Sequence, residues 1–328
     1  MKRSLIFGVS GQDGSYLAEL LLNYGYDVHG LIRRKSDPRL DNIVHIVDRI
    51  VLHSGDICDQ ASVDHVVGDV QPDELYALAA QSFVQASFGQ PIYTAMATGL
   101  GILHVLEAVR RTSPKTRVYV AGSSEQFGQS PPPQHELTIT DPQSPYGVAK
   151  VFARDMAKVY RRAYGLSVSV GILFNHESPI RGLEFVTRKI SMGVAKIAHG
   201  HATHIELGNL DSRRDWGYAK DYVRAMHMML QTEQPDDFAI GTGVDHSVKD
   251  FVMAALKAAG LEPDVDRYVR TSTAHVRPAE VHVLRADASK AKRVLGWVPL
   301  VTFNELVEMM VTADLARVDG TFDLQLHR

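Results

Sequence analysis

Short apolar runs alternate with longer amphipathic stretches through the first half of the chain. Stretches with apolar side chains at helical spacing, such as residues 15–25 and 99–112, separate the runs from one another. Strands that are apolar on both faces and separated by helices are typical of a parallel sheet covered by helices on both sides. We therefore expect an α/β fold with a doubly wound parallel sheet, whose strands lie within residues 5–10, 26–32, 50–56, 74–80, 117–123 and 167–174.

The order of elements changes after Phe174. Residues 204–230 predict a strand, a loop and a helix, residues 237–243 a further strand, and residues 303–318 an amphipathic helix. The later half therefore interrupts the sheet with segments that build a second, smaller unit. We expect a larger sheet domain of residues 1–175 plus about 216–242, and a smaller C-terminal α/β domain of about 176–215 plus 243–328.

Composition and charge exclude several classes of protein. The formal net charge of −3 argues against a nucleic-acid partner bound over the whole surface. Cys58 is the only cysteine, which suits a reducing compartment. The first residues show no signal-peptide pattern, and no run suggests a membrane span, so we expect a cytoplasmic protein without a membrane partner. Fifteen histidines are scattered, and residues 199–204, HGHATH, predict a polar helix end and turn rather than a metal site.

Three glycines stand between the first predicted strand and the first predicted helix. Gly8, Gly11 and Gly14 form a G-x-x-G-x-x-G spacing, a variant of the dinucleotide fingerprint. Glycines let the backbone turn tightly and approach a pyrophosphate, which then lies at the helix N-terminus. The alternative is a tight turn that needs glycine for a positive φ. The context favours an NAD(P)-binding Rossmann fold for the sheet domain.

The residues after the second strand bear on the choice of dinucleotide. An acidic residue there would favour NAD, but this chain has Arg33, Arg34 and Lys35. A guanidinium binds phosphate oxygens in a bidentate manner, so these residues favour the 2′-phosphate of NADP. The alternatives are a solvated basic loop or a subunit contact, and the position after the second strand favours NADP. Asp56, at the end of the third strand, is placed for an adenine contact, and small residues at 78–82 allow a close approach of the cofactor.

Residues 144–150, SPYGVAK, predict the start of a helix with Ser144 as N-cap and Pro145 in the first turn. Tyr146 and Lys150 then share one face, which an ordinary surface helix would also give. A nearby ammonium lowers the pKa of a phenol, and a phenolate can accept a hydroxyl proton as hydride leaves the same carbon.

Ser123 and Glu125 follow the fifth strand, at the edge of the sheet where ligands bind. The Ser123 hydroxyl can orient a substrate oxygen beside the phenol. Simple alcohol oxidation does not require Glu125. An elimination does, because it needs one group that both accepts and donates a proton.

The chain resembles the extended short-chain dehydrogenase/reductase family and, within it, the GDP-mannose 4,6-dehydratases. The resemblance runs from Leu5 to about Ala316, through the ordered blocks GQDGSYLAELL, HGLIRR, LAAQS, GILFNHESPIRG, FVTRKI, LGNLDSRRDWGYAKDYV, RPAEV and LGWVP. It implies a redox-neutral dehydration with NADP. Tyr146 is the base for oxidation at C4 of the sugar, Glu125 removes the C5 proton and protonates the departing C6 hydroxyl, and hydride returns to C6.

The resemblance also implies a set of binding residues and an assembly. The nucleotide-sugar substrate would occupy the smaller domain, and a homotetramer is expected, with a dimer second. Catalytic residues would be Ser123, Glu125, Tyr146 and Lys150. Cofactor contacts would be Gly8, Gly11, Gln12, Asp13, Gly14, Arg33, Arg34, Asp56, Ile57, Leu78, Ala79, Ala80, Gln81, Ser82, Tyr93, Lys150, His176 and Arg181. Substrate contacts would be Ser82, Ser123, Asn175, Lys189, Arg214, Arg277 and Glu280.

The sequence departs from the family pattern near the substrate. Ser123 stands where threonine is usual, Gln143 where an arginine commonly precedes SPY, and Gly122 and Gln126 vary the strand-end block. The same dehydration of another GDP-sugar, such as GDP-D-glycero-D-manno-heptose, therefore stays open. So does a catalytically silent NADP-binding sensor or scaffold, although all four catalytic residues are present. A 4-epimerase or a reductase would not need Glu125.

Overall fold

The computed structural model describes residues 1–33, 40–272 and 279–327. Two predicted ligand contacts, Arg34 and Arg277, and the neighbouring Lys35 lie outside the described residues.

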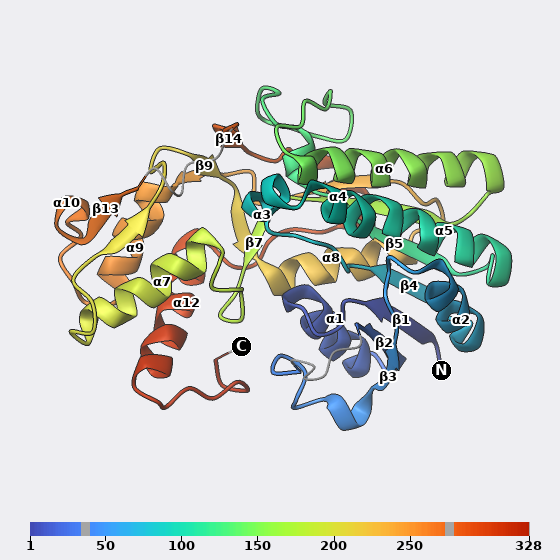
Figure 1. The fold of residues 1–328 in the computed structure, drawn as a ribbon, viewed down its shortest axis with the longest axis horizontal. Helices are drawn as coiled ribbons and strands as arrows, with labels where there is room; N and C mark the ends of the chain where they lie inside the picture. The colour runs from blue at the N-terminus through green and yellow to red at the C-terminus, as the bar shows by residue number, and fades with distance from the viewer. Residues whose placement is uncertain (34–39, 273–278, 328) are drawn as a thin grey trace.

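A seven-stranded parallel sheet forms the centre of the larger half of the molecule (Figure 1). The strand order is β11-β6-β5-β4-β1-β2-β3, and every neighbouring pair is parallel. The chain runs outward from β1 to β3 and then returns to β4, so the order reverses between β1 and β4. Such a reversal opens a crevice at the carboxyl ends of the strands. The doubly wound sheet is confirmed, with β1 (Arg3–Phe7), β2 (Asp27–Ile32), β3 (Val51–Ser54), β4 (Glu74–Ala77), β5 (Arg117–Ala121), β6 (Val168–Leu173) and β11 (Asp237–Ile240).

Helices cover both faces of this sheet. On one face lie α1 (Gln12–Asn23), α8 (Ala219–Gln231) and α11 (Ser289–Leu295), and on the other α2 (Gln60–Val70), α5 (Gly101–Thr112) and α6 (Pro145–Tyr164). Successive side chains of a strand point to opposite faces, so Ile6 packs in the core beneath α1 and α8 whereas Leu5 and Phe7 pack beneath α2 and α5. Burial on both faces explains the continuous apolar runs in the sequence.

The remaining elements build a second hydrophobic core beside the sheet. It joins α7 (Val186–Ala198), α9 (Val248–Ala258), α10 (Val265–Tyr268) and α12 (Phe303–Val318) to β8 (Ile205–Leu207) and β13 (Val269–Thr271). This part lies on the left of Figure 1. The division of the chain into two domains stays a prediction. The helix α11, which the prediction assigns to the smaller domain, packs against β11 and α8 of the sheet half.

Three small strand pairings connect the two halves. They are β7 (Asn175–Glu177) with β10 (Trp216–Tyr218), and β9 (Arg213–Arg214) between β12 (His246–Ser247) and β14 (Val283–Leu284). The short strands β7, β9 and β10 bring residues of both halves to the edge of the crevice.

One helical run requires a correction. The expectation that no segment suggests a membrane span is too strong, because the 22-residue run Pro91–Thr112 contains an 18-residue window with a mean hydropathy of 1.4. This run comprises α4 (Pro91–Thr94), the π-helical turn η2 (Ala95–Leu100) and α5. By length and composition alone it could cross a membrane. However, 56% of its most apolar window is buried inside the protein, and a buried core helix passes the same test.

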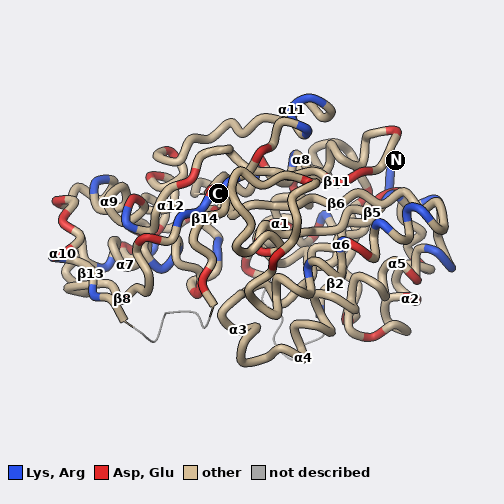
Figure 2. The backbone as a smooth tube through the Cα atoms, turned by 90° about the horizontal axis from the view of Figure 1, so that it is seen from above, with Lys and Arg blue, Asp and Glu red and all other residues tan. Residues whose placement is uncertain are grey.

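Charged residues of both signs are interspersed over the molecule (Figure 2). The even mixture agrees with the small net charge of −3. Any strong electrostatic field must therefore come from a local group of residues rather than from one face of the protein.

Candidate active site

The carboxyl ends of β1, β4, β5 and β6 open into a cavity of about 460 Å³ between the sheet and the second core. It extends from the glycine loop to β9 and α7. The cavity gathers most of the predicted site residues: Gly8, Gly11, Gln12, Asp13, Gly14, Leu78, Ala79, Ala80, Ser82, Ser123, Glu125, Tyr146, Lys150, Asn175, His176, Arg181, Lys189, Arg214 and Glu280.

A second cavity of about 470 Å³ adjoins the first along the glycine loop. Arg33, Asp56, Ile57 and Tyr93 line it, and Gly8, Gly11, Ala79 and Ala80 line both cavities. The Arg33 guanidinium donates a 2.6 Å hydrogen bond to the hydroxyl of Tyr93. Gln81, also a predicted cofactor contact, is not among the described residues that line these two cavities. Its side-chain amide donates to the carbonyl oxygen of Phe83 at 2.9 Å.

Two glycines of the loop are required by close backbone approaches. Gly8 has a φ of +90°, and a Cβ there would lie 3.0 Å from the amide nitrogen of Ala79. A Cβ on Gly14 would lie 2.2 Å from the carbonyl oxygen of Gly8. Gly11 is the N-cap of α1 and provides no side-chain cap. The first amide groups of α1 therefore face the cavity region without a capping side chain, which is the arrangement that binds anions.

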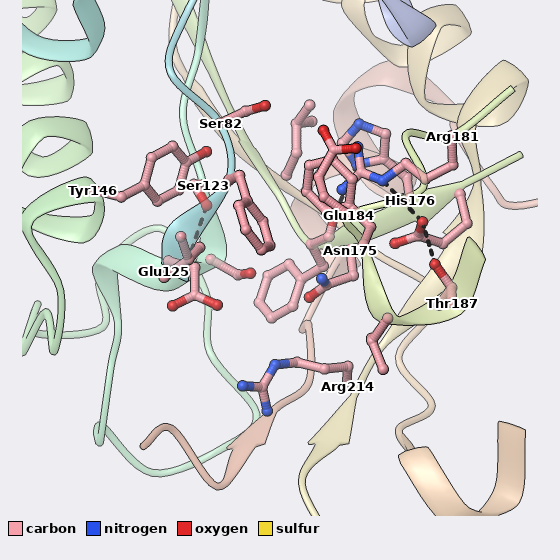
Figure 3. A pocket seen from close by; sticks show the side chains of 18 of the residues that line it. Ser82, Ser123, Glu125, Tyr146, Asn175, His176, Arg181, Glu184, Thr187 and Arg214 are labelled. Carbon is pink, nitrogen blue, oxygen red and sulfur yellow. Dashed lines mark hydrogen bonds and ion pairs between the residues drawn. The ribbon is translucent and has the colours of Figure 1, made fainter. Parts of the chain in front are cut away.

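The reacting groups stand on one wall of the cavity (Figure 3). Ser123 caps a short 3₁₀ turn, η3 (Ser124–Gln126), and its hydroxyl oxygen accepts from the amide of Glu125 at 3.2 Å. The helix α6 begins as predicted: Ser144 is its N-cap, accepting from the amide of Gly147 at 3.0 Å. Tyr146, Ser123 and Glu125 are thereby brought together from two elements.

The net pKa of Tyr146 is raised in this structure, not lowered as expected from the neighbouring Lys150. Burial raises the pKa of Tyr146 to about 12, with a smaller opposing effect from the hydrogen bond to Ser123. Burial also lowers the pKa of Lys150 to about 8. The Lys150 ammonium donates to the carbonyl oxygen of Ala121 at 2.6 Å and lies 5.6 Å from the centroid of the Tyr146 ring rather than at its oxygen. Desolvation is therefore the largest influence on the pKa of each group.

The facing wall is fixed by a buried carboxylate. Glu177, on β7, is 2% exposed, accepts a hydrogen bond from the Thr187 hydroxyl at 2.7 Å and forms an ion pair with Nε of Arg181 at 3.0 Å. The Arg181 guanidinium lies 3.5 Å from the centroid of the Phe185 ring. These contacts hold the segment that carries Arg181 against the start of α7 (Figure 3).

The far end of the cavity is positively charged. Arg214 is buried and donates to the carbonyl oxygen of Arg213 at 2.8 Å, and burial lowers the pKa of Lys189. The next residue, Asp215, accepts from the amides of Thr242 and Gly243, each at 2.8 Å. Asp215 thus fixes the strand that presents Arg214.

Three residues that position the site, Glu177, Thr187 and Asp215, were not among the predicted site residues, although they lie in the blocks GILFNHESPIRG, FVTRKI and LGNLDSRRDWGYAKDYV. Glu177 and Asp215 stand directly beside predicted contacts, His176 and Arg214. Their role depends on donors that are distant in sequence, as for Asp215, whose partner Thr242 follows 27 residues later. The available signals were their place in these blocks and, for Glu177 and Asp215, an acidic residue next to a predicted ligand.

A family model described as GDP-mannose 4,6 dehydratase matches residues 5–310 of the chain. The chain is 48% identical over 326 residues to GDP-mannose 4,6 dehydratase 2 of Arabidopsis thaliana, covering 96% of this chain and 87% of that protein. It is 46% identical over 350 residues to the GDP-mannose 4,6-dehydratase of Yersinia enterocolitica, covering 96% and 94%. The chain belongs to the GDP-mannose 4,6-dehydratase family.

A solved structure agrees with this family's fold. DesIV, a dTDP-glucose 4,6-dehydratase from Streptomyces venezuelae with NAD and TYD bound, superimposes with a TM-score of 0.85. The match is 23% identical and covers 98% of this chain and 99% of that chain. It supports the Rossmann-type fold assigned from the sheet.

The search for a metal centre among the described residues finds no group of three or more His, Cys, Asp or Glu side chains. The HGHATH segment follows α7, which ends at Ala198, and the prediction of a helix end and turn is confirmed. His199 pairs there with Asp319 at 2.6 Å.

Proposed function

We propose that the protein converts GDP-mannose to GDP-4-keto-6-deoxy-mannose and water, with NADP as a recycled cofactor. The observation that carries this proposal is Glu125 beside Ser123 and Tyr146 on one wall of a cavity that also contains the glycine loop. An oxidoreductase needs the hydroxyl and the phenol, whereas only an elimination uses the carboxyl group as well. Membership of the dehydratase family supports the same reaction.

Each step of the reaction assigns a proton to one side chain. Tyr146 accepts the proton of the sugar C4 hydroxyl while the C4–H bond gives up its hydride, leaving a ketone. The ketone acidifies the C5–H bond, and Glu125 takes that proton. Glu125 then protonates the C6 hydroxyl, which leaves as water with formation of a C5–C6 double bond. Hydride addition at C6, with addition at C5 of the proton that Tyr146 took from the C4 hydroxyl, completes the reaction and returns both side chains to their starting states. Ser123 orients the C4 oxygen.

A bound nicotinamide dinucleotide would supply the hydride acceptor and, later, the same hydride. The residues of the two cavities fit such a group, because Gly8 and Gly14 leave room for a backbone approach and α1 presents uncapped amides. We assign the pyrophosphate to the glycine loop and the 2′-phosphate to Arg33, which Tyr93 holds in the second cavity. The positive charge of the oxidised ring would lower the high pKa of Tyr146.

The GDP portion of the substrate is assigned to the far end of the cavity. Lys189 and Arg214 offer cationic donors for a diphosphate, and Glu280 offers a carboxylate for a ribose diol. Asn175 lies above Arg214 in Figure 3, across from Glu125 and Ser123.

We further propose that the protein is a cytoplasmic homotetramer, with a dimer as the second choice. Exposed apolar side chains form a stripe on two packed helices, at positions Ile92, Met96 and Leu100 of the 91–112 run and Val148, Phe152 and Val159 of α6. Residues at this spacing share one helical face, and such a stripe favours a helix-to-helix subunit contact. The lone Cys58 suits a reducing compartment.

Mass spectrometry with absorbance at 340 nm tests the proposed reaction. Purified protein is incubated with GDP-mannose and a catalytic amount of NADP⁺. The proposal expects the substrate to lose the mass of one water with no net accumulation of NADPH. Stoichiometric NADPH would indicate a plain dehydrogenase, and an unchanged mass with C4 inversion a 4-epimerase. Binding of GDP-mannose without any reaction would contradict GDP-mannose as the substrate and direct the assay to a GDP-heptose.

A further inference from the structure

His176 lies between two groups that can only accept hydrogen bonds. Its Nε2 is 2.7 Å from a carboxylate oxygen of Asp13, and its Nδ1 is 2.8 Å from the carbonyl oxygen of Phe174. A neutral imidazole has one N–H and could satisfy only one of these partners. With Asp13 ionised, as its lowered pKa indicates, both nitrogens donate. The geometry then points to an imidazolium paired with the Asp13 carboxylate.

The surroundings agree with this charge state. Burial alone would lower the pKa of His176, but the Asp13 carboxylate outweighs it and the pKa is raised. Burial alone would raise the pKa of Asp13, but His176 reverses this and the pKa is lowered. The other groups that face the ring are Arg181, which opposes its charge, and the phenol ring of Tyr222, stacked at 4.6 Å. Glu177, next along β7, is engaged by Arg181 and Thr187 instead.

The pair joins two elements from opposite sides of the cavity. Asp13 lies in the first turn of α1, and His176 lies on β7. Gln12 reinforces the junction, because its amide donates to the other Asp13 oxygen at 3.0 Å and to the carbonyl oxygen of His176 at 3.2 Å. The Ser178 hydroxyl donates to the Gln12 oxygen at 2.8 Å. The start of α1 is therefore tied to the strand that carries Asn175.

A carboxylate in this position creates an electrostatic conflict. The N-terminus of α1, beside the glycine loop, is the anion-binding end of the helix. An uncompensated Asp13 would repel a pyrophosphate there, because both groups are negatively charged in a partly buried site. His176 removes the conflict by balancing the negative charge of Asp13.

We propose that His176 is a positioning residue that acts through Asp13. As an imidazolium it neutralises the carboxylate at the start of α1, so that this charge does not repel a bound dinucleotide. This inference rests on the proposed function only in taking a dinucleotide as the ligand. It differs from a direct contact between His176 and the cofactor, in which Asp13 would have no part in affinity.

A double-mutant cycle with NADP⁺ as the probe separates the two roles. In His176→Gln the Asp13 carboxylate loses its counter-charge, and we expect the dissociation constant of NADP⁺ to rise about tenfold or more. In the double variant Asp13→Asn/His176→Gln both charges are gone, and we expect affinity to return to within about threefold of wild type. Asp13→Asn alone should bind at least as tightly as wild type. A double variant as weak as His176→Gln would overturn the proposal in favour of direct contact.

Histidine NMR of the cofactor-free protein tests the ion pair without any assumption about function. With the ring carbon of histidine labelled, His176 is assigned from the signal missing in His176→Gln. We expect it to titrate above the ordinary histidine range and to titrate at least about one pH unit lower in Asp13→Asn. Equal titration in both proteins would overturn the ion pair. Failure of wild type to bind NAD⁺ or NADP⁺, with the NMR shift present, would instead refute the proposed function alone.

Discussion

Lys150 donates its ammonium to the carbonyl oxygen of Ala121 at 2.6 Å, at the carboxyl end of β5. It is 4% exposed, and burial lowers its pKa to about 8. The ammonium therefore bears a desolvation cost in the folded protein that a neutral side chain would not bear. This residue stands where a charge serves the reaction at the expense of stability.

Lys150→Met should make the protein more stable and inactive. Between pH 8 and 10.5 the Lys150 side chain is protonated in the unfolded chain but mostly neutral in the folded protein. The free energy of unfolding of the wild type therefore rises with pH through that window. At pH 7 we expect a net gain of about 1–2 kcal/mol, after allowing for the lost hydrogen bond. The advantage should shrink as pH rises to 10.5. The measurement is the apparent melting temperature of each protein as a function of pH, with the exposed Lys257→Met as control. A Lys150→Met variant less stable than wild type at pH 7 would refute the desolvation argument.

Ser123 should act through its hydroxyl, which lowers the otherwise raised pKa of Tyr146. Ser123→Ala is expected to reduce kcat about 100-fold, because the phenol loses the partner that favours its ionised form. Ser123→Thr keeps the hydroxyl and should retain activity within about fivefold. Steady-state rates of the three proteins decide this. Equal kcat values for the Ser123→Ala and Ser123→Thr variants would show that the hydroxyl has no role.

Glu125→Gln should abolish dehydration while NADP⁺ still binds. The amide can neither take the C5 proton nor give one to the C6 hydroxyl, so we expect kcat to fall at least about 100-fold. Product mass and NADP⁺ titration are measured in parallel. Glu184→Gln changes another carboxyl group that lines the cavity, to which we assign no step, and serves as the matched control. Full turnover by Glu125→Gln would remove Glu125 from the mechanism.

Arg33→Gln should weaken binding of NADP⁺ and leave binding of NAD⁺ nearly unchanged. The guanidinium lines the second cavity beside Tyr93, and its charge is useful only to a 2′-phosphate. We expect the preference for NADP⁺ over NAD⁺ to fall about 10–100-fold. Dissociation constants of both cofactors provide the comparison. A similar loss for both would indicate a general role of Arg33 in folding or in the ribose contact.

Phe152→Asp should break the proposed helix-to-helix contact between subunits. It places a charge in the middle of the exposed apolar stripe on α6, next to Gly99 of the 91–112 run. Light scattering coupled to size exclusion should show a smaller assembly than wild type. Val294→Asp, an exposed apolar residue on α11, is the control and should leave the mass unchanged. An unchanged mass for Phe152→Asp would reject this surface as the subunit contact.

The sequence predicted features that depend on neighbours along the chain. Ser144 and Pro145 marked the start of α6 because capping is local, and the apolar runs marked the strands because both sheet faces are covered. The pKa of Tyr146 could not be predicted, since it depends on how completely the tertiary fold buries the ring. The contact between Asp13 and His176 joins residues 163 positions apart and has no local signature. The sequence thus locates the reacting groups better than it predicts their charge states.

Transfer of a labelled hydride tests the central claim most directly. GDP-mannose carrying deuterium at C4 is converted by wild-type protein with catalytic unlabelled NADP⁺, and the product is analysed by NMR and mass spectrometry. The account predicts a product that has lost one water and carries the deuterium at C6. Deuterium that remains at C4, or that collects in reduced cofactor, would contradict a hydride removed at C4 and returned within the same active site.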